Sequence, residues 1–156
     1  FIISTEHGPQ GGDEINLNDL ENKKTKNYGW PISSYGEHYG GKNDELNVKK
    51  YLKYPLLKSH TENNFIEPIK YFVPSIGISE ISKIKNNDNY LLSSLRDRSI
   101  YTFKINNNKN IKEFNRFQLG ERVRDFVIIN DEILFFLEET ASIIIIKTED
   151  LIKKYN

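Results

Sequence analysis

The sequence contains no cysteine and no methionine, and only five prolines and one tryptophan occur among its 156 residues. The absence of cysteine excludes disulfides, thiolate metal sites and a cysteine nucleophile, but it leaves the cellular compartment open. No apolar run approaches the length that crosses a bilayer, so no transmembrane segment is expected. The chain lacks an initial Met and a signal peptide and opens on apolar Phe1 to Ile3. We therefore expect a fragment of a longer protein.

The formal charges balance, because the chain has 22 Lys and Arg residues and 22 Asp and Glu residues. This balance gives no indication of nucleic acid or of a membrane surface as a partner. Aromatic residues make up 12% of the chain, which argues against disorder and for a packed core. The length fits one ordinary domain. No spacing typical of a zinc site, a phosphate loop, a dinucleotide fingerprint or a nucleophile elbow is present.

A weak internal repeat runs through the second half of the chain. An offset of 43 residues superimposes Gly77–Lys104 on Gly120–Lys147. The identical pairs are Gly77/Gly120, Asn87/Asn130, Asp88/Asp131, Leu91/Leu134, Ser99/Ser142, Ile100/Ile143 and Lys104/Lys147. Each unit has the pattern strand, Asn-Asp turn, strand, short turn, strand. A period of about 40 to 50 residues is typical of propeller blades, and two similar β-meanders in a sandwich are the alternative.

The alternation of apolar residues and turn residues predicts an all-β chain with a single short helix. The predicted strands are Phe1–Ser4, Glu14–Leu17, Ile66–Phe72, Gly77–Ile84, Tyr90–Leu95, Ser99–Ile105, Ile111–Phe117, Val123–Ile129, Glu132–Leu137 and Ser142–Lys147. Residues 32–64 are polar and rich in Gly, Tyr and Lys, and we interpret them as an extended loop. Thr148 can cap a short helix that runs to Lys154.

A glycine-rich segment follows the first predicted strand. Residues 6–16, with the sequence EHGPQGGDEIN, hold three glycines, one proline and three acids. Glycine allows backbone geometries that other residues avoid, so this loop can turn carbonyl oxygens inward. Hard cations prefer such oxygen ligands. The alternative is that Asp13 and Glu14 are solvated loop residues, which is the commoner situation for such acids.

Arginine is scarce in this Lys-rich chain and occurs at only five positions. Arg122 and Arg124 lie two residues apart on a predicted strand, so both side chains should point to one face. Two adjacent like charges need an anionic partner, such as a planar molecule with several carboxylates. The alternative pairs Arg122 with Glu121, and Arg124 with Asp125 or another surface acid.

Three segments, HGPQGGDEIN (7–16), KNYGWP (26–31) and GERVRD (120–125), occur in this order. Together they resemble the soluble glucose/sorbosone dehydrogenases, which use pyrroloquinoline quinone (PQQ), and the bacterial aldose sugar dehydrogenases above all. The resemblance implies a six-bladed β-propeller, of which residues 1–156 would be about the C-terminal half. It also implies an oxidoreductase of the periplasm or extracellular space. Such an enzyme oxidises the anomeric hydroxyl of an aldose to a lactone.

By the same resemblance, Arg122 and Arg124 match the pair that holds the PQQ carboxylates. Arg96 stands where some members carry a lysine that contacts the cofactor; its alternative is a solvated turn residue paired with the adjacent Asp. Ser75 matches a hydroxyl beside PQQ, and a turn-capping serine is its alternative. His7 matches a His or Gln near the cofactor, although a lone loop histidine is more often structural.

The resemblance further implies two calcium sites. The backbone carbonyls of Gly8 and Pro9 match those that bind the calcium next to PQQ. Glu14 and the carbonyl of Tyr28 match a second, structural site. Residues 19–22 form an apparent insertion between Glu14 and Tyr28, which puts the second site in question.

The resemblance places the catalytic histidine and an Arg-Asn pair in the N-terminal half of the family domain, outside these residues. The chain alone should therefore be inactive and should require the missing half as a partner. His38 and His60 lie in polar loop sequence and are not singled out. A non-catalytic extracellular recognition module and a truncated remnant are the alternative functions.

Overall fold

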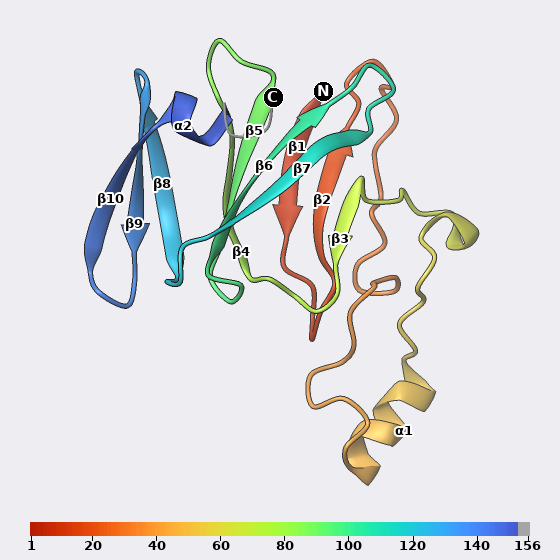
Figure 1. Ribbon diagram of the computed structural model, residues 1–156. Helices are drawn as coiled ribbons and strands as arrows, with labels where there is room; N and C mark the ends of the chain where they lie inside the picture. The colour runs from red at the N-terminus through yellow and green to blue at the C-terminus, as the bar shows by residue number, and fades with distance from the viewer. Residues whose placement is uncertain (153–156) are drawn as a thin grey trace. The chain divides into compact units, whose positions relative to one another are not determined.

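The computed structural model describes residues 1–152 and consists mostly of strands in three antiparallel sheets. The chain divides into two compact units, Phe1–Ile76 and Gly77–Asn156 (Figure 1). Sheets built from consecutive antiparallel strands are the architecture expected of propeller blades. The predicted all-β class is therefore confirmed, and each unit is described by itself below.

The first unit is built around β2 (Asp13–Asn18), which lies between β1 (Ile2–Glu6) and β3 (Lys70–Phe72). Residues 13–17 are all buried. The hairpin pairs Ile2 with Asn18 and Glu6 with Glu14, so the glycine-rich loop closes one end of the sheet. The predicted strand Ile66–Phe72 is shorter in the structure, because only its last three residues pair with β2.

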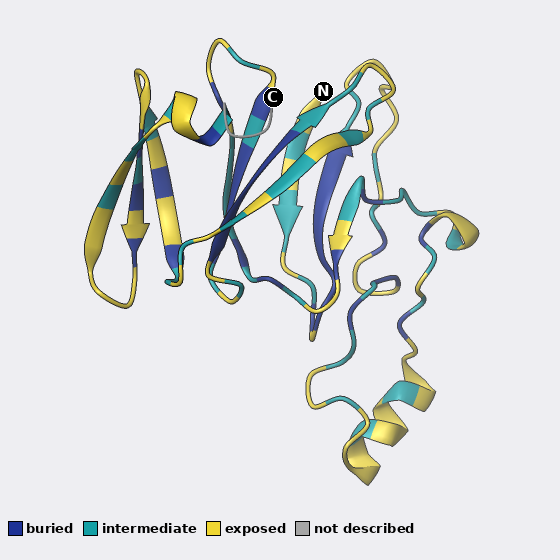
Figure 2. Ribbon diagram, viewed as in Figure 1, coloured by how far each residue is buried: buried dark blue, intermediate teal, exposed yellow. Residues whose placement is uncertain are grey.

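The long segment between β2 and β3 contains a helix, α1 (Glu45–Lys53), and a 3-10 turn at Thr61–Asn63. The prediction of an extended loop over residues 32–64 is therefore wrong at these positions. The Oδ1 atom of Asp44 accepts a 2.8 Å hydrogen bond from the Asn47 amide and caps the helix. No residue of α1 is buried (Figure 2). Within residues 1–152, no helix is long and apolar enough to cross a membrane.

The second unit holds two sheets formed by consecutive strands. The first has the order β4-β5-β6-β7 and the second the order β10-β9-β8. The strands are β4 (Ile78–Lys83), β5 (Asn89–Ser94), β6 (Ser99–Ile105), β7 (Ile111–Gln118), β8 (Val123–Ile129), β9 (Glu132–Leu137) and β10 (Ser142–Lys147). The prediction gave β6, β8, β9 and β10 with the same bounds. The remaining strands of this unit differ by one residue at one or both ends.

A short helix, α2 (Thr148–Ile152), follows β10. The helix was predicted to reach Lys154, and that part of the prediction lies outside the described residues. The Thr148 hydroxyl donates a 3.0 Å hydrogen bond to the Asp131 carbonyl, so it ties α2 to the β8–β9 turn instead of capping the helix. Leu151 of α2 is buried.

The 43-residue repeat is present in the fold. The β5–β6 pair Asn89/Lys104 maps onto the β9–β10 pair Glu132/Lys147. The first strand of each sheet follows an offset of 45 residues instead, from Ile78 to Val123. The reason is that the turn at residues 85–88 is two residues longer than the Asn130–Asp131 turn.

Both first strands carry a β-bulge at the same place. The register shifts between Ile78 and Glu80 in β4, and between Val123 and Asp125 in β8. A bulge inserts one extra residue and re-aims the side chains around it. In β8 the inserted residue is Arg124, one of the two arginines singled out from the sequence.

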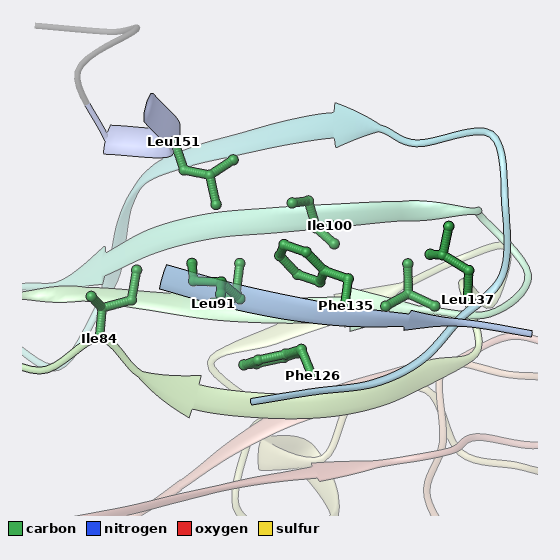
Figure 3. Packing of buried hydrophobic residues seen from close by; sticks show 9 residues of the cluster. Ile84, Leu91, Ile100, Phe126, Phe135, Leu137 and Leu151 are labelled. Atoms are coloured by element: carbon green, nitrogen blue, oxygen red, sulfur yellow. The ribbon is translucent and has the colours of Figure 1, made fainter. Parts of the chain in front are cut away.

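The two sheets of the second unit pack face to face around one hydrophobic cluster (Figure 3). Leu91 and Ile100 reach the cluster from the first sheet, and Phe126 and Phe135 from the second. The Ser79 hydroxyl donates a 2.6 Å hydrogen bond to the Val123 carbonyl and links β4 to β8. These contacts fix two successive blades against each other.

Candidate functional site

The loop that joins β1 to β2 curls back on itself. A Cβ atom at Gly8 would lie 2.3 Å from the carbonyl oxygens of both Gly11 and Gly12, so only glycine fits there. Gly12 has a positive φ of 72° and lies against the amide of Gly36. The Gly8 amide donates a 3.1 Å hydrogen bond to Oδ1 of Asp13. Carbonyl oxygens therefore do turn into this loop, at Gly11 and Gly12.

A small cavity of about 10 Å³ opens beside the loop. Its lining residues are Glu6, His7, Gly8, Gly12, Glu14, Tyr28, Trp30, Ser33 and Ser34. The volume suits one water-sized or ion-sized occupant. Four residues predicted from the sequence, His7, Gly8, Glu14 and Tyr28, thus meet at one place. Pro9 is buried but does not line the cavity.

Glu14 is the buried acid of this cavity, with 6% of its surface exposed. Burial raises the pKa of Glu14 to about 7, against a partial lowering by the hydrogen bond with Asn16, and the charges of Glu6 and Glu67 raise it further. Asp13 is fully buried as well. The view of these two acids as solvated loop residues is therefore wrong.

Sequence reasoning missed His60, which lies fully buried against Glu14. The Nε2 atom of His60 is 3.4 Å from Oε1 of Glu14. Burial lowers the pKa of His60 below its usual value, although Glu67 opposes the shift. Its neighbours Lys58, Ser59 and Thr61 are polar, so no local pattern indicates that His60 is buried.

Glu6, the second missed residue, contributes another carboxylate to the cavity. Its Oε1 atom accepts a 3.0 Å hydrogen bond from Nδ2 of Asn16. Among residues 1–152, no group of three or more His, Cys, Asp or Glu side chains is placed to hold a metal. A cation here would depend on Glu6 and Glu14 together with backbone carbonyls, which are the oxygen ligands that calcium accepts. The residues present fit such a small hard cation.

The apparent insertion after β2 does not remove Tyr28 from the cavity. Residues 20–22 are exposed, and Oδ1 of Asp19 accepts a 3.2 Å hydrogen bond from the Glu21 amide. The Tyr28 hydroxyl donates a 3.1 Å hydrogen bond to the Leu17 carbonyl at the end of β2. The extra residues therefore form a local turn outside the site.

In the second unit, Arg122 and Arg124 converge on a single acid. Oε2 of Glu138 lies 3.3 Å from Nε of Arg122 and 2.6 Å from Nη2 of Arg124. Desolvation would raise the pKa of Glu138, but the two guanidinium groups outweigh it and lower that pKa. The alternative that pairs Arg124 with another surface acid is therefore what the structure shows, with Glu138 as that acid. Glu121 and Asp125 bond elsewhere: Glu121 accepts from Thr140, and Asp125 from the Phe126 amide.

Arg96 is exposed at the turn between β5 and β6. Its expected alternative partner, Asp97, pairs instead with Arg116, whose Nε atom lies 2.7 Å from Oδ2 of Asp97. The alternative reading of Arg96 as the partner of Asp97 is therefore wrong. Ser75 lies half-buried after β3 in the first unit.

Known proteins resemble this chain in sequence. The family model for glucose/sorbosone dehydrogenase matches residues 1–147. The aldose sugar dehydrogenase YliI of Escherichia coli (strain K12) is 30% identical over 146 residues, which are 88% of this chain and 35% of that protein. The uncharacterised protein slr1608 of Synechocystis sp. is 30% identical over 131 residues, 80% of this chain and 28% of that protein. The chain thus spans about a third of the length of these relatives.

Solved structures show the same fold. The soluble aldose sugar dehydrogenase of Escherichia coli, in its apo-form, superposes with a TM-score of 0.67 at 26% identity. The alignment covers 92% of this chain and 40% of that one. A glucose dehydrogenase structure also superposes with a TM-score of 0.67, at 21% identity over 90% of this chain and 39% of that one. The strands thus form a partial β-propeller, and the chain belongs to the glucose/sorbosone dehydrogenase family.

Proposed function

We propose that these residues form the C-terminal part of a PQQ-dependent sugar dehydrogenase that oxidises the anomeric hydroxyl of an aldose to a lactone. The observation that carries the proposal is the small cavity, which gathers His7, Gly8, Glu14 and Tyr28 from two separate segments. The name of one relative, the aldose sugar dehydrogenase of Escherichia coli, supports a sugar as the substrate class. The greater length of that relative supports a role as part of a larger enzyme.

Bound PQQ would supply the hydride acceptor for this chemistry. Arg122 and Arg124 would hold its carboxylates, because both guanidinium groups already point at one carboxylate, that of Glu138. Arg96, Ser75 and His7 are the further residues that, by the family resemblance, we propose for contact with PQQ. Exchange of Glu138 for a cofactor carboxylate would conserve the number of charge-assisted hydrogen bonds.

Calcium would bind at the glycine-rich loop. The Gly8 and Pro9 carbonyls would hold the ion next to the cofactor, and the Glu14 carboxylate with the Tyr28 carbonyl would hold the second ion. This assignment is supported by the small cavity, which both Glu14 and Tyr28 line. A calcium ion next to the cofactor would polarise a carbonyl as a Lewis acid and orient the ring.

The catalytic histidine base and the Arg-Asn pair would come from the N-terminal half of the propeller, and the complete enzyme would work in the periplasm or extracellular space. We therefore expect the 156-residue chain to show no dye reduction with aldoses, even with PQQ and Ca²⁺ present. It should nevertheless bind the cofactor weakly through its own residues. Robust turnover by the chain alone would contradict this division of the site.

The test is a melting experiment with PQQ in the presence and absence of Ca²⁺. A ligand that binds only the folded state raises the melting temperature. The wild-type chain should show a rise that needs both additions. The R122Q/R124Q double variant should lose it, and R98Q should retain it, because Arg98 forms a comparable exposed pair with Glu139. If PQQ leaves the melting temperature of all three proteins unchanged, the alternative function, that of a non-catalytic recognition module, is favoured instead.

A further inference from the structure

The two arginines at the start of β8 meet one internal carboxylate. Nε of Arg122 lies 3.3 Å from Oε2 of Glu138, and Nη2 of Arg124 lies 2.6 Å from the same oxygen. The backbone amide of Glu138 also donates a 2.9 Å hydrogen bond to the Arg122 carbonyl. The pairing of β8 with β9 therefore anchors this acid opposite the arginines, in the stretch where the bulge inserts Arg124.

This contact uses a small part of what the arginines offer. A guanidinium group carries five N–H donors in a planar fork. Within the described part of the chain, the side chains of Arg122 and Arg124 donate one hydrogen bond each, and both go to Glu138. These two side chains are 36% and 56% exposed, so solvent can reach them. Two positive charges also face one negative charge, which leaves the group able to attract a further anion.

The Glu138 carboxylate thus occupies the place that an anionic ligand of the arginine pair would take. We propose that Glu138 is an internal competitor for this pair, which an incoming anion has to displace. A ligand with one carboxylate would replace Glu138 one for one, gaining no contact and losing its freedom of motion. A ligand with several carboxylates could also use the donors that Glu138 leaves unused, and those charge-assisted hydrogen bonds favour the exchange.

The competitor therefore sets the specificity of the arginine pair. Specificity requires that the wrong ligand is disfavoured as well as that the right one is bound. Glu138 would keep the pair free of simple carboxylates and reserve it for anions that are rich in carboxylates. This inference deepens the proposed function and rests on it for the identity of the cofactor. The competition itself depends only on Glu138 and the two arginines.

The first test measures the modification of individual arginines by phenylglyoxal, resolved by tandem mass spectrometry. Phenylglyoxal attacks the neutral guanidine, so a carboxylate that stabilises the charged form slows the reaction. In E138Q, Arg122 and Arg124 should react at least about threefold faster than in the wild type, because the ion pairs are lost. The matched control is E139Q, since Glu139 is the adjacent acid and lies 2.7 Å from Arg98. E139Q should speed the modification of Arg98 alone.

The second test uses a bound anion as protection against the same reagent. Citrate serves as the carboxylate-rich probe, and acetate as the probe with one carboxylate. In the wild type, citrate should protect Arg122 and Arg124, and acetate should not. In E138Q, half protection should need at least about threefold less citrate, and acetate should begin to protect at concentrations that fail in the wild type. E139Q should behave like the wild type.

A second neutral variant, E138A, removes the amide with which glutamine could form a replacement hydrogen bond, and it should behave like E138Q. Unchanged modification rates in both variants, or the same half-protecting citrate concentration as in the wild type, would overturn the proposal. Melting curves recorded without anion show whether the variants fold. If neither folds, Glu138 serves stability instead of competition, which overturns the proposal as well.

Failure of the proposed function would give a different result. PQQ should protect Arg122 and Arg124 as citrate does, and at lower concentration in E138Q than in the wild type. If PQQ protects neither arginine in any of these proteins while citrate behaves as expected, the cofactor assignment is wrong and the competitor role of Glu138 is retained.

Discussion

The Glu14 carboxylate is a buried acid beside the glycine-rich loop. It lies in the central strand of its sheet, contacts His60 at 3.4 Å and lines the small cavity. Burial disfavours the charged form of a carboxylate, which is why the pKa of Glu14 rises to about 7. Such perturbed groups cluster at functional sites. Glu14 is therefore the residue on which the calcium proposal depends most.

Asp97 provides a test of pH dependence at the residue scale. Desolvation would raise its pKa, but hydrogen bonds from Arg116 and Tyr101 lower it below the usual value. A carboxyl whose pKa is lower in the folded state than in the unfolded state stabilises the fold at pH values above its unfolded-state pKa. This stabilisation is lost as the pH falls through the folded-state pKa. We expect D97N to cost about 1 kcal/mol at pH 6, because the pair is partly exposed and screened.

The cost of D97N should shrink as the pH falls below the usual carboxyl range, because the wild-type carboxyl is then protonated as well. Urea denaturation of both proteins from pH 6 downward measures this difference. D88N is the matched control, since Asp88 is 88% exposed and 3.9 Å from Lys83. A D97N penalty that does not change with pH would show that the side chain stabilises through packing alone.

At the scale of elements, the sequence predicted the strands of the second unit because their apolar alternation and Asn-Asp turns act locally. The bulge at Arg124 could not be predicted, since it depends on the pairing of Val123 and Asp125 with β9. The helix α1 was missed although Asp44, Glu45 and the lysines of its last turn form a helix signal. Its apolar residues contact no core, so its pattern resembled that of a loop.

Candidate site residues could likewise be predicted only where the signal lies in neighbouring residues of the sequence. The glycine-rich loop was recognisable because glycine and proline restrict their own neighbours. The partners His60 and Glu138 could not be predicted, because 46 and 14 residues of chain separate them from Glu14 and Arg124. Only the fold brings such groups together.

The glycine-rich loop allows a matched pair of substitutions. Gly11 and Gly12 both have positive φ, at 91° and 72°. A Cβ at Gly11 meets nothing closer than 3.7 Å, whereas one at Gly12 would lie 2.3 Å from the Gly36 amide nitrogen. G11A should therefore cost about 1 to 2 kcal/mol for backbone strain alone, and G12A more than about 3 kcal/mol because the loop must also move.

Denaturant unfolding monitored by the fluorescence of Trp30, the single tryptophan, compares the two variants. Trp30 lines the cavity beside this loop, so its emission reports on the first unit. Equal destabilisation by G11A and G12A would mean that the close approach of Gly12 to Gly36 does not persist in solution.

At the scale of the molecule, the repeat explains why the chain has both a well-packed and an exposed apolar surface. Two blades can bury one shared interface, and the outer blade then presents the face that a further blade would cover. Repeat proteins derive much of their stability from such neighbour contacts. The exposed isoleucines of β10 are therefore a consequence of the radial architecture and not a defect of the sequence.

Phe135 and Phe136 are adjacent in β9, and their side chains point to opposite faces of the sheet. Phe135 is fully buried in the shared cluster, and Phe136 is 37% exposed on the opposite face of the same sheet. F135A should destabilise the second unit by about 3 to 5 kcal/mol, because it leaves a cavity between the sheets. F136A should cost only about 1 kcal/mol in the chain alone, because Phe136 loses little more than its cross-strand contact with Ile143. Hydrogen exchange over residues 77–152 measures both effects, and a large loss of protection in F136A would mean that its face is already covered in solution.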